Sequence, residues 1–161
     1  MTPFMAIDEV RAIPGLERAR YEDPYSGGIG NSVRYLGMAP CNDALKVDGV
    51  ENLFVGGEKA GTLVGHTEAV ATGLLAGNNA VRHCLDMEYL ILPDSLATGD
   101  FIKYVHQQMT TIEGLRLRYT FSGAVYFERM QQHKLYSISR SDIQERVASA
   151  GFTDVYNKCL V

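Results

Sequence analysis

The chain has 161 residues, of which 46% are hydrophobic and 21% charged, and its formal net charge is −4. This composition is that of a folded globular protein with a sizeable core, and it argues against a disordered tail or an overall basic field for nucleic acid. The three cysteines, Cys41, Cys84 and Cys159, are too widely spaced for a disulfide framework or a zinc knuckle, which favours a reducing cytoplasm. No apolar run reaches the roughly 18 residues of a membrane span, and no secretory signal opens the chain, so we expect no membrane contact.

The first fifty residues carry weak structural signals. Pro3 and Pro14 discourage a long helix near the N-terminus. Residues 23–32 are a loop with three glycines in four positions, either a flexible connection or a place where backbone approaches a ligand. These glycines do not fit the G-x-G-x-x-G phosphate fingerprint between a strand and a helix. A strand is expected at residues 32–38, before Ala39 and Pro40.

The strongest pattern runs over residues 50–82. The apolar run 53–55 predicts a buried strand, residues 56–61 form a glycine turn, and a helical pattern starts at His66 after a second turn that ends at Gly65. A strand, a glycine turn and a helix N-terminus together present backbone N–H groups to an anionic or polar ligand.

Small residues follow one face of the predicted helix, at spacings of three and four: Ala69, Gly73, Ala76, Gly77 and Ala80. Each glycine inside a helix costs about 1 kcal/mol relative to alanine. We interpret the stripe as a packing surface where another backbone, such as a sheet, lies close to the helix.

The pattern changes after Cys84. Asp94 or Ser95 is expected to cap a helix that runs to about Met109, with Leu96, Phe101, Ile102 and Val105 on its inner side. Residues 110–136 are ambiguous, because 115–119 alternate as a strand does while 124–132 fit a helix. A capping box at Ser141 and Gln144 predicts a last helix that ends before Gly151.

These elements predict an α+β fold, or a fragment of an α/β fold. Residues 1–85 would form a sheet-bearing segment with the small-residue helix, and residues 86–161 a mainly helical domain. No internal repeat or low-complexity segment interrupts the two parts.

Four segments of the chain resemble the C-terminal part of two related flavoenzyme families. These are the folate- and FAD-dependent tRNA (uracil-5-)-methyltransferase family TrmFO and the tRNA wobble-uridine-modifying family GidA. The similar segments are residues 11–19 (RAIPGLERA), 51–58 (ENLFVGGE), 68–80 (EAVATGLLAGNNA) and, more weakly, 93–104. The resemblance implies that this chain is a fragment of a FAD-dependent oxidoreductase linked to tRNA uridine modification, with tRNA as a partner of the parent protein.

The resemblance also implies which residues face FAD: Gly57, Glu58, Gly65, His66 and Thr67. Glycines at 57 and 65 permit close approach, and N–H groups at 65–67 would stabilise negative charge on a reduced flavin. The families usually have glutamine in place of Glu58 and tyrosine near His66, and residues 63–64 include an insertion.

The resemblance implies an incomplete enzyme. The fingerprint that holds the FAD pyrophosphate would lie in an N-terminal segment outside this sequence, as would the families' catalytic cysteines, so Cys41 inherits no catalytic role. We expect this chain alone to be inactive and not to bind FAD tightly. Its exposed sheet edges and glycine-rich helix face predict a homo-oligomer.

The second hypothesis is a non-catalytic interaction module that binds RNA or a protein partner through residues 86–161. Basic residues alternate there with aromatic ones, as single-stranded nucleic acid prefers, although the same aromatics could form a small core. The basic residues are Arg116, Arg118, Arg129, His133, Lys134, Arg140 and Arg146. Metal ligation is not indicated, because His66, His83, His106 and His133 show no ligand spacing with one another or with cysteine.

Overall fold

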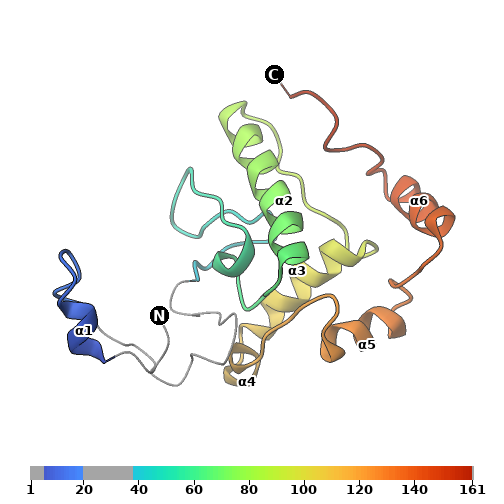
Figure 1. Cartoon of the computed structure of the whole chain (residues 1–161). Coiled ribbons are helices and arrows are strands. Elements are labelled where there is room, and N and C mark those ends of the chain that lie inside the picture. Colours follow the sequence, from blue (N-terminus) through green and yellow to red (C-terminus); the bar gives the residue numbers. More distant parts are fainter. Residues whose placement is uncertain (1–5, 20–37, 161) are drawn as a thin grey trace.

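The computed structural model describes residues 6–19 and 38–160. Its elements are α1 (Ile7–Arg11), the 3-10 turn η2 (Gly57–Lys59), α2 (His66–Cys84), α3 (Ala97–Gln108), α4 (Ile112–Arg116), α5 (Ala124–Gln132) and α6 (Arg140–Ser149). Figure 1 shows α2 and α3 at the centre, α1 on one side, and α6 with the C-terminal segment on the other. None of the described helices is long and apolar enough to cross a lipid bilayer. The predicted loop at 23–32 and strand at 32–38 lie outside the described residues, except for Met38.

Extended backbone pairs only through isolated bridges in the described part of the chain. Cys41 pairs with Val47 and Lys46 with Phe54 in antiparallel bridges, and Leu63 pairs with Tyr119 in a parallel one. The predicted strand at 53–55 is therefore a single bridge, whose flanking bonds run from Val47 N–H to the Leu53 carbonyl and from Val55 N–H to the Leu45 carbonyl.

The interpretation of residues 53–55 as a buried strand was wrong at Leu53, which is 46% exposed. This run has a neighbour on one side only, the segment around Lys46, so a single pairing replaces a ladder. The sheet-bearing α+β class and the division at residue 85 stay predictions.

The helix predicted from His66 is confirmed as α2, but its buried face differs from the small-residue stripe. Glu68, Thr72, Leu75, Ala76 and Asn79 point inward, whereas Gly73 and Gly77 are exposed. The Asn79 amide fastens two loops to the helix, since Nδ2 donates to the carbonyls of Ala44 and Leu90 at 2.9 Å and Oδ1 accepts the Leu90 N–H at 2.7 Å. The inner side of α2 is therefore hydrogen-bonded to two loops and does not lie on a sheet.

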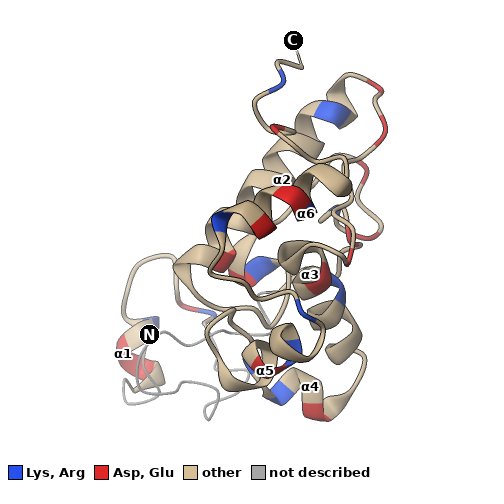
Figure 2. Ribbon diagram, turned by 90° about the vertical axis from the view of Figure 1, so that its right-hand side faces the viewer, with Lys and Arg blue, Asp and Glu red and all other residues tan. Residues whose placement is uncertain are grey.

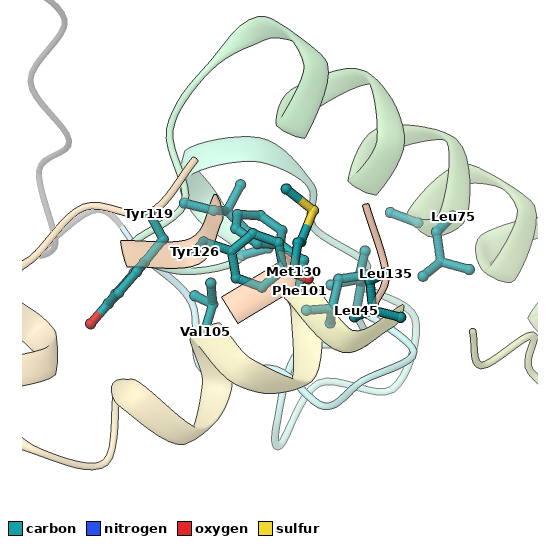
Figure 3. Packing of buried hydrophobic residues seen from close by; sticks show 12 residues of the cluster. Leu45, Leu75, Phe101, Val105, Tyr119, Tyr126, Met130 and Leu135 are labelled. Carbon is teal, nitrogen blue, oxygen red and sulfur yellow. The ribbon is translucent and has the colours of Figure 1, made fainter. Parts of the chain in front are cut away.

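Aromatic and aliphatic side chains from distant segments form the core shown in Figure 3. Three of the residues predicted on the inner side of α3 lie there, since Phe101, Ile102 and Val105 are buried. The fourth, Leu96, is the N-cap and only half-buried. Phe101 contacts the rings of Phe121 and Tyr126, each with a centroid separation of 4.5 Å. This cluster joins α3 to α5 and to the loop that precedes α5.

Two predicted caps lie elsewhere. The N-cap of α3 is Leu96, with no side-chain cap, because the Asp94 carboxylate instead contacts Lys103 Nζ at 3.3 Å. The cap of α6 is Ser139, whose Oγ accepts the Asp142 N–H at 3.3 Å, so this helix starts before the predicted Ser141. The end of α6 is as predicted, since Gly151 follows the C-cap with φ +77°.

The ambiguous segment 110–136 is about half helical. It contains α4, the bridging residue Tyr119, and α5 over the residues for which the pattern fitted a helix.

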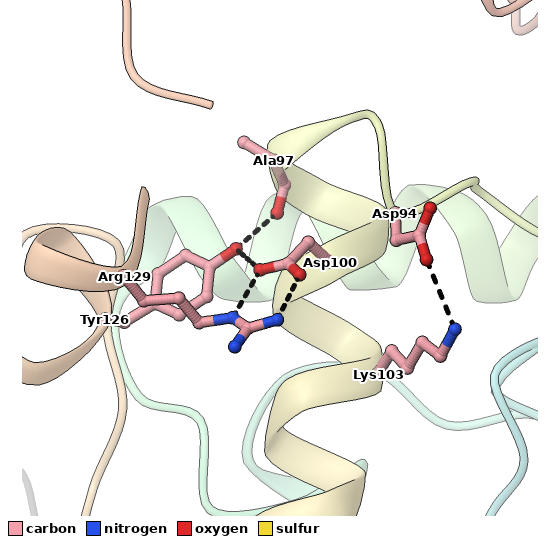
Figure 4. Close-up of polar contacts among 6 residues, drawn as sticks. All are labelled: Asp94, Ala97, Asp100, Lys103, Tyr126 and Arg129. Atoms are coloured by element: carbon pink, nitrogen blue, oxygen red, sulfur yellow. Dashed lines mark hydrogen bonds and ion pairs between the residues drawn. The ribbon is translucent and has the colours of Figure 1, made fainter. Parts of the chain in front are cut away.

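An ion pair between a buried carboxylate and a partly buried guanidinium fastens α5 to α3 (Figure 4). Arg129 donates from Nε to Asp100 Oδ2 at 2.9 Å and from Nη2 to Oδ1 at 2.6 Å. Tyr126 adds a hydrogen bond to Oδ2 at 3.0 Å, and the Arg129 guanidinium lies 4.8 Å from the centre of the Tyr104 ring. Because Asp100 is buried, these bonds replace the water that the carboxylate loses on folding.

Candidate functional site

The glycine turn is held directly against α2. Gly57 has φ +61°, and its N–H donates to Thr72 Oγ1 at 2.8 Å, while the same hydroxyl donates to the Glu68 carbonyl at 2.7 Å. At Gly56 the two backbones nearly touch, since a Cβ there would lie 2.8 Å from Gly73 Cα. Glycine at 56 is thus required by close approach, which is the role the sequence assigned to the glycines of the helix.

The N-terminus of α2 has no side-chain cap. Its N-cap is Gly65, whose φ of 126° suits glycine and whose missing side chain leaves room for the Glu68 carboxylate. That carboxylate is only 4% exposed, and its Oε1 accepts the Phe121 N–H at 2.6 Å. Glu68 thus braces the loop before α5 and does not cap its own helix, so the first N–H groups of α2 are not capped by a side chain.

The structure brings the five predicted FAD-facing residues to two adjoining elements. Gly57 and Glu58 belong to η2, which packs against α2, and Gly65, His66 and Thr67 form the start of α2. Gly57 is buried, whereas the other four are exposed. The arrangement offers accessible backbone and side chains beside a positive helix end, and the assignment to FAD stays a prediction.

A thiol, an imidazole and a carboxylate meet at a second place, which sequence spacing did not indicate. Cys41 Sγ lies 3.7 Å from His106 Nε2, and His106 Nδ1 lies 2.8 Å from Asp43 Oδ1. Burial, with the nearby charges of Asp48 and Asp43, raises the pKa of the Cys41 thiol to about 12. The thiol is therefore protonated at neutral pH, and the trio joins the 41–43 segment to α3. Its members are up to 65 residues apart in sequence, which is why no local motif reveals it.

Several basic residues of the C-terminal half make ion pairs or hydrogen bonds within the protein. Arg129 pairs with Asp100, Arg146 donates to the carbonyls of Leu135 and Lys134, and Arg118 donates to those of Leu115 and Leu117. In Figure 2 the Lys and Arg segments alternate with acidic ones along the ribbon. Within the described ranges, no group of three or more His, Cys, Asp or Glu side chains could hold a metal ion.

The glycine turn is thus fastened to α2 at Thr72 and Gly73, and the start of that helix has no side-chain cap. Comparison with known proteins gives the lineage of the chain. The family model described as glucose inhibited division protein A matches residues 5–88, just over half of the chain. The chain belongs to the glucose inhibited division protein A family. No solved structure matches it.

Curated relatives come from two kinds of tRNA-modifying protein. The tRNA uridine 5-carboxymethylaminomethyl modification enzyme MnmG of Chlorobaculum tepidum is 40% identical over 85 residues, which is 52% of this chain and 13% of that protein. A methylenetetrahydrofolate–tRNA-(uracil-5-)-methyltransferase TrmFO of Thermus thermophilus is 33% identical over 99 residues, or 60% of this chain and 21% of that protein.

A longer alignment reaches past α5. TrmFO of Thermosipho melanesiensis is 28% identical over 140 residues, or 84% of this chain and 30% of that protein. The chain thus matches less than a third of the length of each of these three relatives. The predicted resemblance to the GidA and TrmFO families is confirmed.

Proposed function

We propose that the chain is part of a FAD-dependent oxidoreductase of the GidA/TrmFO type and forms one wall of its flavin site. The observation that carries the proposal is the uncapped start of α2 beside the glycine turn at Gly57, both inside the segment that matches the family. The names of the relatives supply the proposed setting, which is modification of a tRNA uridine.

The local residues suit a flavin in three ways. First-turn N–H groups of a helix favour partial negative charge, which builds up on the flavin ring as it is reduced. Gly57 and Gly65 let a flat ring or ribityl chain approach the backbone. Glu58, exposed on η2, offers a carboxylate to a ribityl hydroxyl. When bound, FAD would supply the hydride or electron transfer, for which this wall provides position and charge only.

The proposal has consequences for partners and location. The remaining surface of FAD would contact a segment outside this chain, so this chain alone should bind FAD weakly and be inactive. The parent protein would act on tRNA in the cytoplasm, a location that suits three cysteines without a disulfide.

An FAD titration followed by ¹⁵N NMR tests the proposal on the chain itself. We expect the purified protein to be colourless and FAD to shift the amide signals of residues 57–58 and 65–67 with weak affinity. A titration that leaves these signals unmoved would overturn the flavin wall. A stoichiometric yellow complex would contradict the claim that most of the cofactor surface lies elsewhere.

The alternative, an interaction module that binds RNA through residues 86–161, is less well supported because Arg118, Arg129 and Arg146 are engaged in internal contacts. A tRNA mobility-shift series over salt concentration separates the two proposals, since phosphate binding weakens steeply with salt. Salt-dependent binding by this chain would favour the RNA module.

A further inference from the structure

The segment that precedes α2 is joined to the C-terminal half of the chain by backbone hydrogen bonds. Tyr119 N–H donates to the Thr62 carbonyl at 3.0 Å, and Val64 N–H donates to the Tyr119 carbonyl at 2.9 Å. Tyr119 is buried, and it lies outside residues 5–88, which match the family model. The backbone that leads into the helix is therefore held by a part of the chain beyond the matched region.

The first turn of α2 is joined to the same segment by one side chain, that of Glu68. This residue is 4% exposed, and its Oε1 accepts the Phe121 N–H at 2.6 Å. The other carboxylate oxygen, Oε2, occupies the place that a Cβ at Gly65 would take. A hydrogen bond to a carboxylate is stronger than one between neutral groups. Residues 65–67 thus lie between two attachments to residues 119–121, and of these two only the attachment at Glu68 depends on a side chain.

Glu68 also contacts the glycine turn, through its backbone. Its carbonyl accepts the Thr72 hydroxyl at 2.7 Å, and the same hydroxyl accepts the Gly57 N–H at 2.8 Å. The side chain and the carbonyl of this one residue therefore connect the glycine turn, the start of α2 and the segment before α5.

We propose that Glu68 is a positioning residue of the flavin wall, whose carboxylate sets the backbone of residues 65–67 against residues 119–121. The carboxylate acts through the backbone, because it is buried and both of its oxygens contact the protein. The inference rests on the proposed function for the identity of the ligand, whereas the position of the backbone is measurable without FAD. The C-terminal half thereby shapes a site whose FAD-facing residues all belong to the matched region.

Amide hydrogen exchange of the full chain, followed by ¹⁵N NMR without FAD, tests the position of the backbone. In Glu68→Ala we expect the Phe121 amide to exchange about tenfold faster relative to the Val105 amide of α3, and the signals of residues 65–67 to shift. Glu68→Gln keeps an oxygen that can accept the Phe121 N–H, and it should restore both measurements to near the wild-type values. Glu128→Ala, exposed on α5, is the control and should change neither.

An FAD titration of the same variants tests the consequence for the ligand. Glu68→Ala should weaken FAD binding about tenfold, and Glu68→Gln should stay within about threefold of the wild-type affinity. If FAD moves no signal in the wild-type chain, the flavin wall fails, and the exchange rates alone decide whether Glu68 positions the helix start.

Three results would overturn the proposal. They are an unchanged relative exchange rate of the Phe121 amide in Glu68→Ala, an unchanged FAD affinity in that variant, and a Glu68→Gln variant that behaves as Glu68→Ala does. Glu68→Met, which keeps the length of the side chain without the acceptor, replaces Glu68→Ala if circular dichroism shows that the alanine variant is unfolded.

Discussion

The Thr72 hydroxyl joins Gly57 to α2, accepting the Gly57 N–H at 2.8 Å while it donates to the Glu68 carbonyl. Both Thr72 and Gly57 are buried. One side chain thus satisfies a donor in the turn and fixes the turn on the helix, so the geometry of the candidate site depends on it.

Substitution of Thr72 by Val should destabilise the protein by about 1–3 kcal/mol, because a buried N–H loses its acceptor without a change in volume. Thermal or urea unfolding measures the loss. Thr72→Ser keeps the hydroxyl and should recover most of the stability. Equal unfolding free energies for the Val and Ser variants would show that the hydrogen bond does not hold the turn.

We predict that the protein loses stability in acid, because Asp100 becomes protonated there. Burial alone raises its pKa, but hydrogen bonds from Arg129 and Tyr126 outweigh burial and hold the pKa below its usual value. A carboxylate with a lowered folded-state pKa stabilises the fold above its unfolded pKa of about 4, and this stability disappears as the pH falls through the folded-state value.

Asp100→Asn tests this ion pair. We expect a loss of about 2–4 kcal/mol at pH 7, since removal of one partner leaves Arg129 partly buried without its counterion. The variant should also lose part of the acid dependence seen in denaturant titrations below pH 5. Asp94→Asn, at the exposed pair with Lys103, is the control and should cost little. An unchanged pH profile in Asp100→Asn would contradict the assignment.

Cys41 should react slowly with alkylating reagents. Its thiol pKa of about 12 leaves almost no thiolate at pH 7, whereas Cys84 and Cys159 are exposed. Mass spectrometry of the iodoacetamide-treated native protein should find Cys41 modified last, and unfolding should make the three cysteines equivalent. Asp48→Asn removes a nearby negative charge and should speed the reaction at Cys41. Fast native alkylation of Cys41 would show that His106 stabilises a thiolate.

The outer face of α2 predicts self-association. Val70, Leu74 and Val81 are 71%, 50% and 40% exposed, and Gly77 between them has open space around it. These positions alternate at spacings of four and three, which is the spacing of a helix–helix seam. Sedimentation velocity should detect a weak homo-oligomer that Leu74→Gln reduces. Ile138→Gln, exposed on another segment, is the control. A clean monomer at all concentrations would remove the prediction.

Local signals in the sequence predicted α2, the inner side of α3 and the end of α6, because periodicity and a glycine after the last turn are properties of single elements. The caps of α3 and α6 were misplaced where a competing contact decided the outcome. Asp94 pairs with Lys103. Ser139 caps α6 through the N–H of Asp142, three residues on, which is the spacing that the predicted box at Ser141 and Gln144 has two residues later.

The contacts that build the candidate site were beyond prediction because they join distant residues. In the sequence Thr72 is an ordinary helix residue, and only the structure shows that it accepts the Gly57 N–H. Glu68 is likewise an ordinary first-turn acid in the sequence, and only the structure shows that it accepts the Phe121 N–H. The stripe of small residues implied that another backbone lies close to the glycines of the helix, but a Cβ at Gly73 or Gly77 would meet nothing within 4 Å. The glycine that close approach requires is Gly56, where a Cβ would lie 2.8 Å from Gly73 Cα.

The central claim is tested most directly by placing a segment of this chain in a relative and measuring the flavin content of the resulting protein. Residues 51–80 of this chain would replace the matching segment of MnmG from Chlorobaculum tepidum, which the resemblance marks as a flavoenzyme, and flavin would be measured per protein after gel filtration. We predict that the graft keeps its flavin, that Gly65→Val in the graft loses most of it, and that Val70→Ala has no effect. A Gly65→Val graft that retains as much flavin as the unsubstituted graft would contradict the flavin wall.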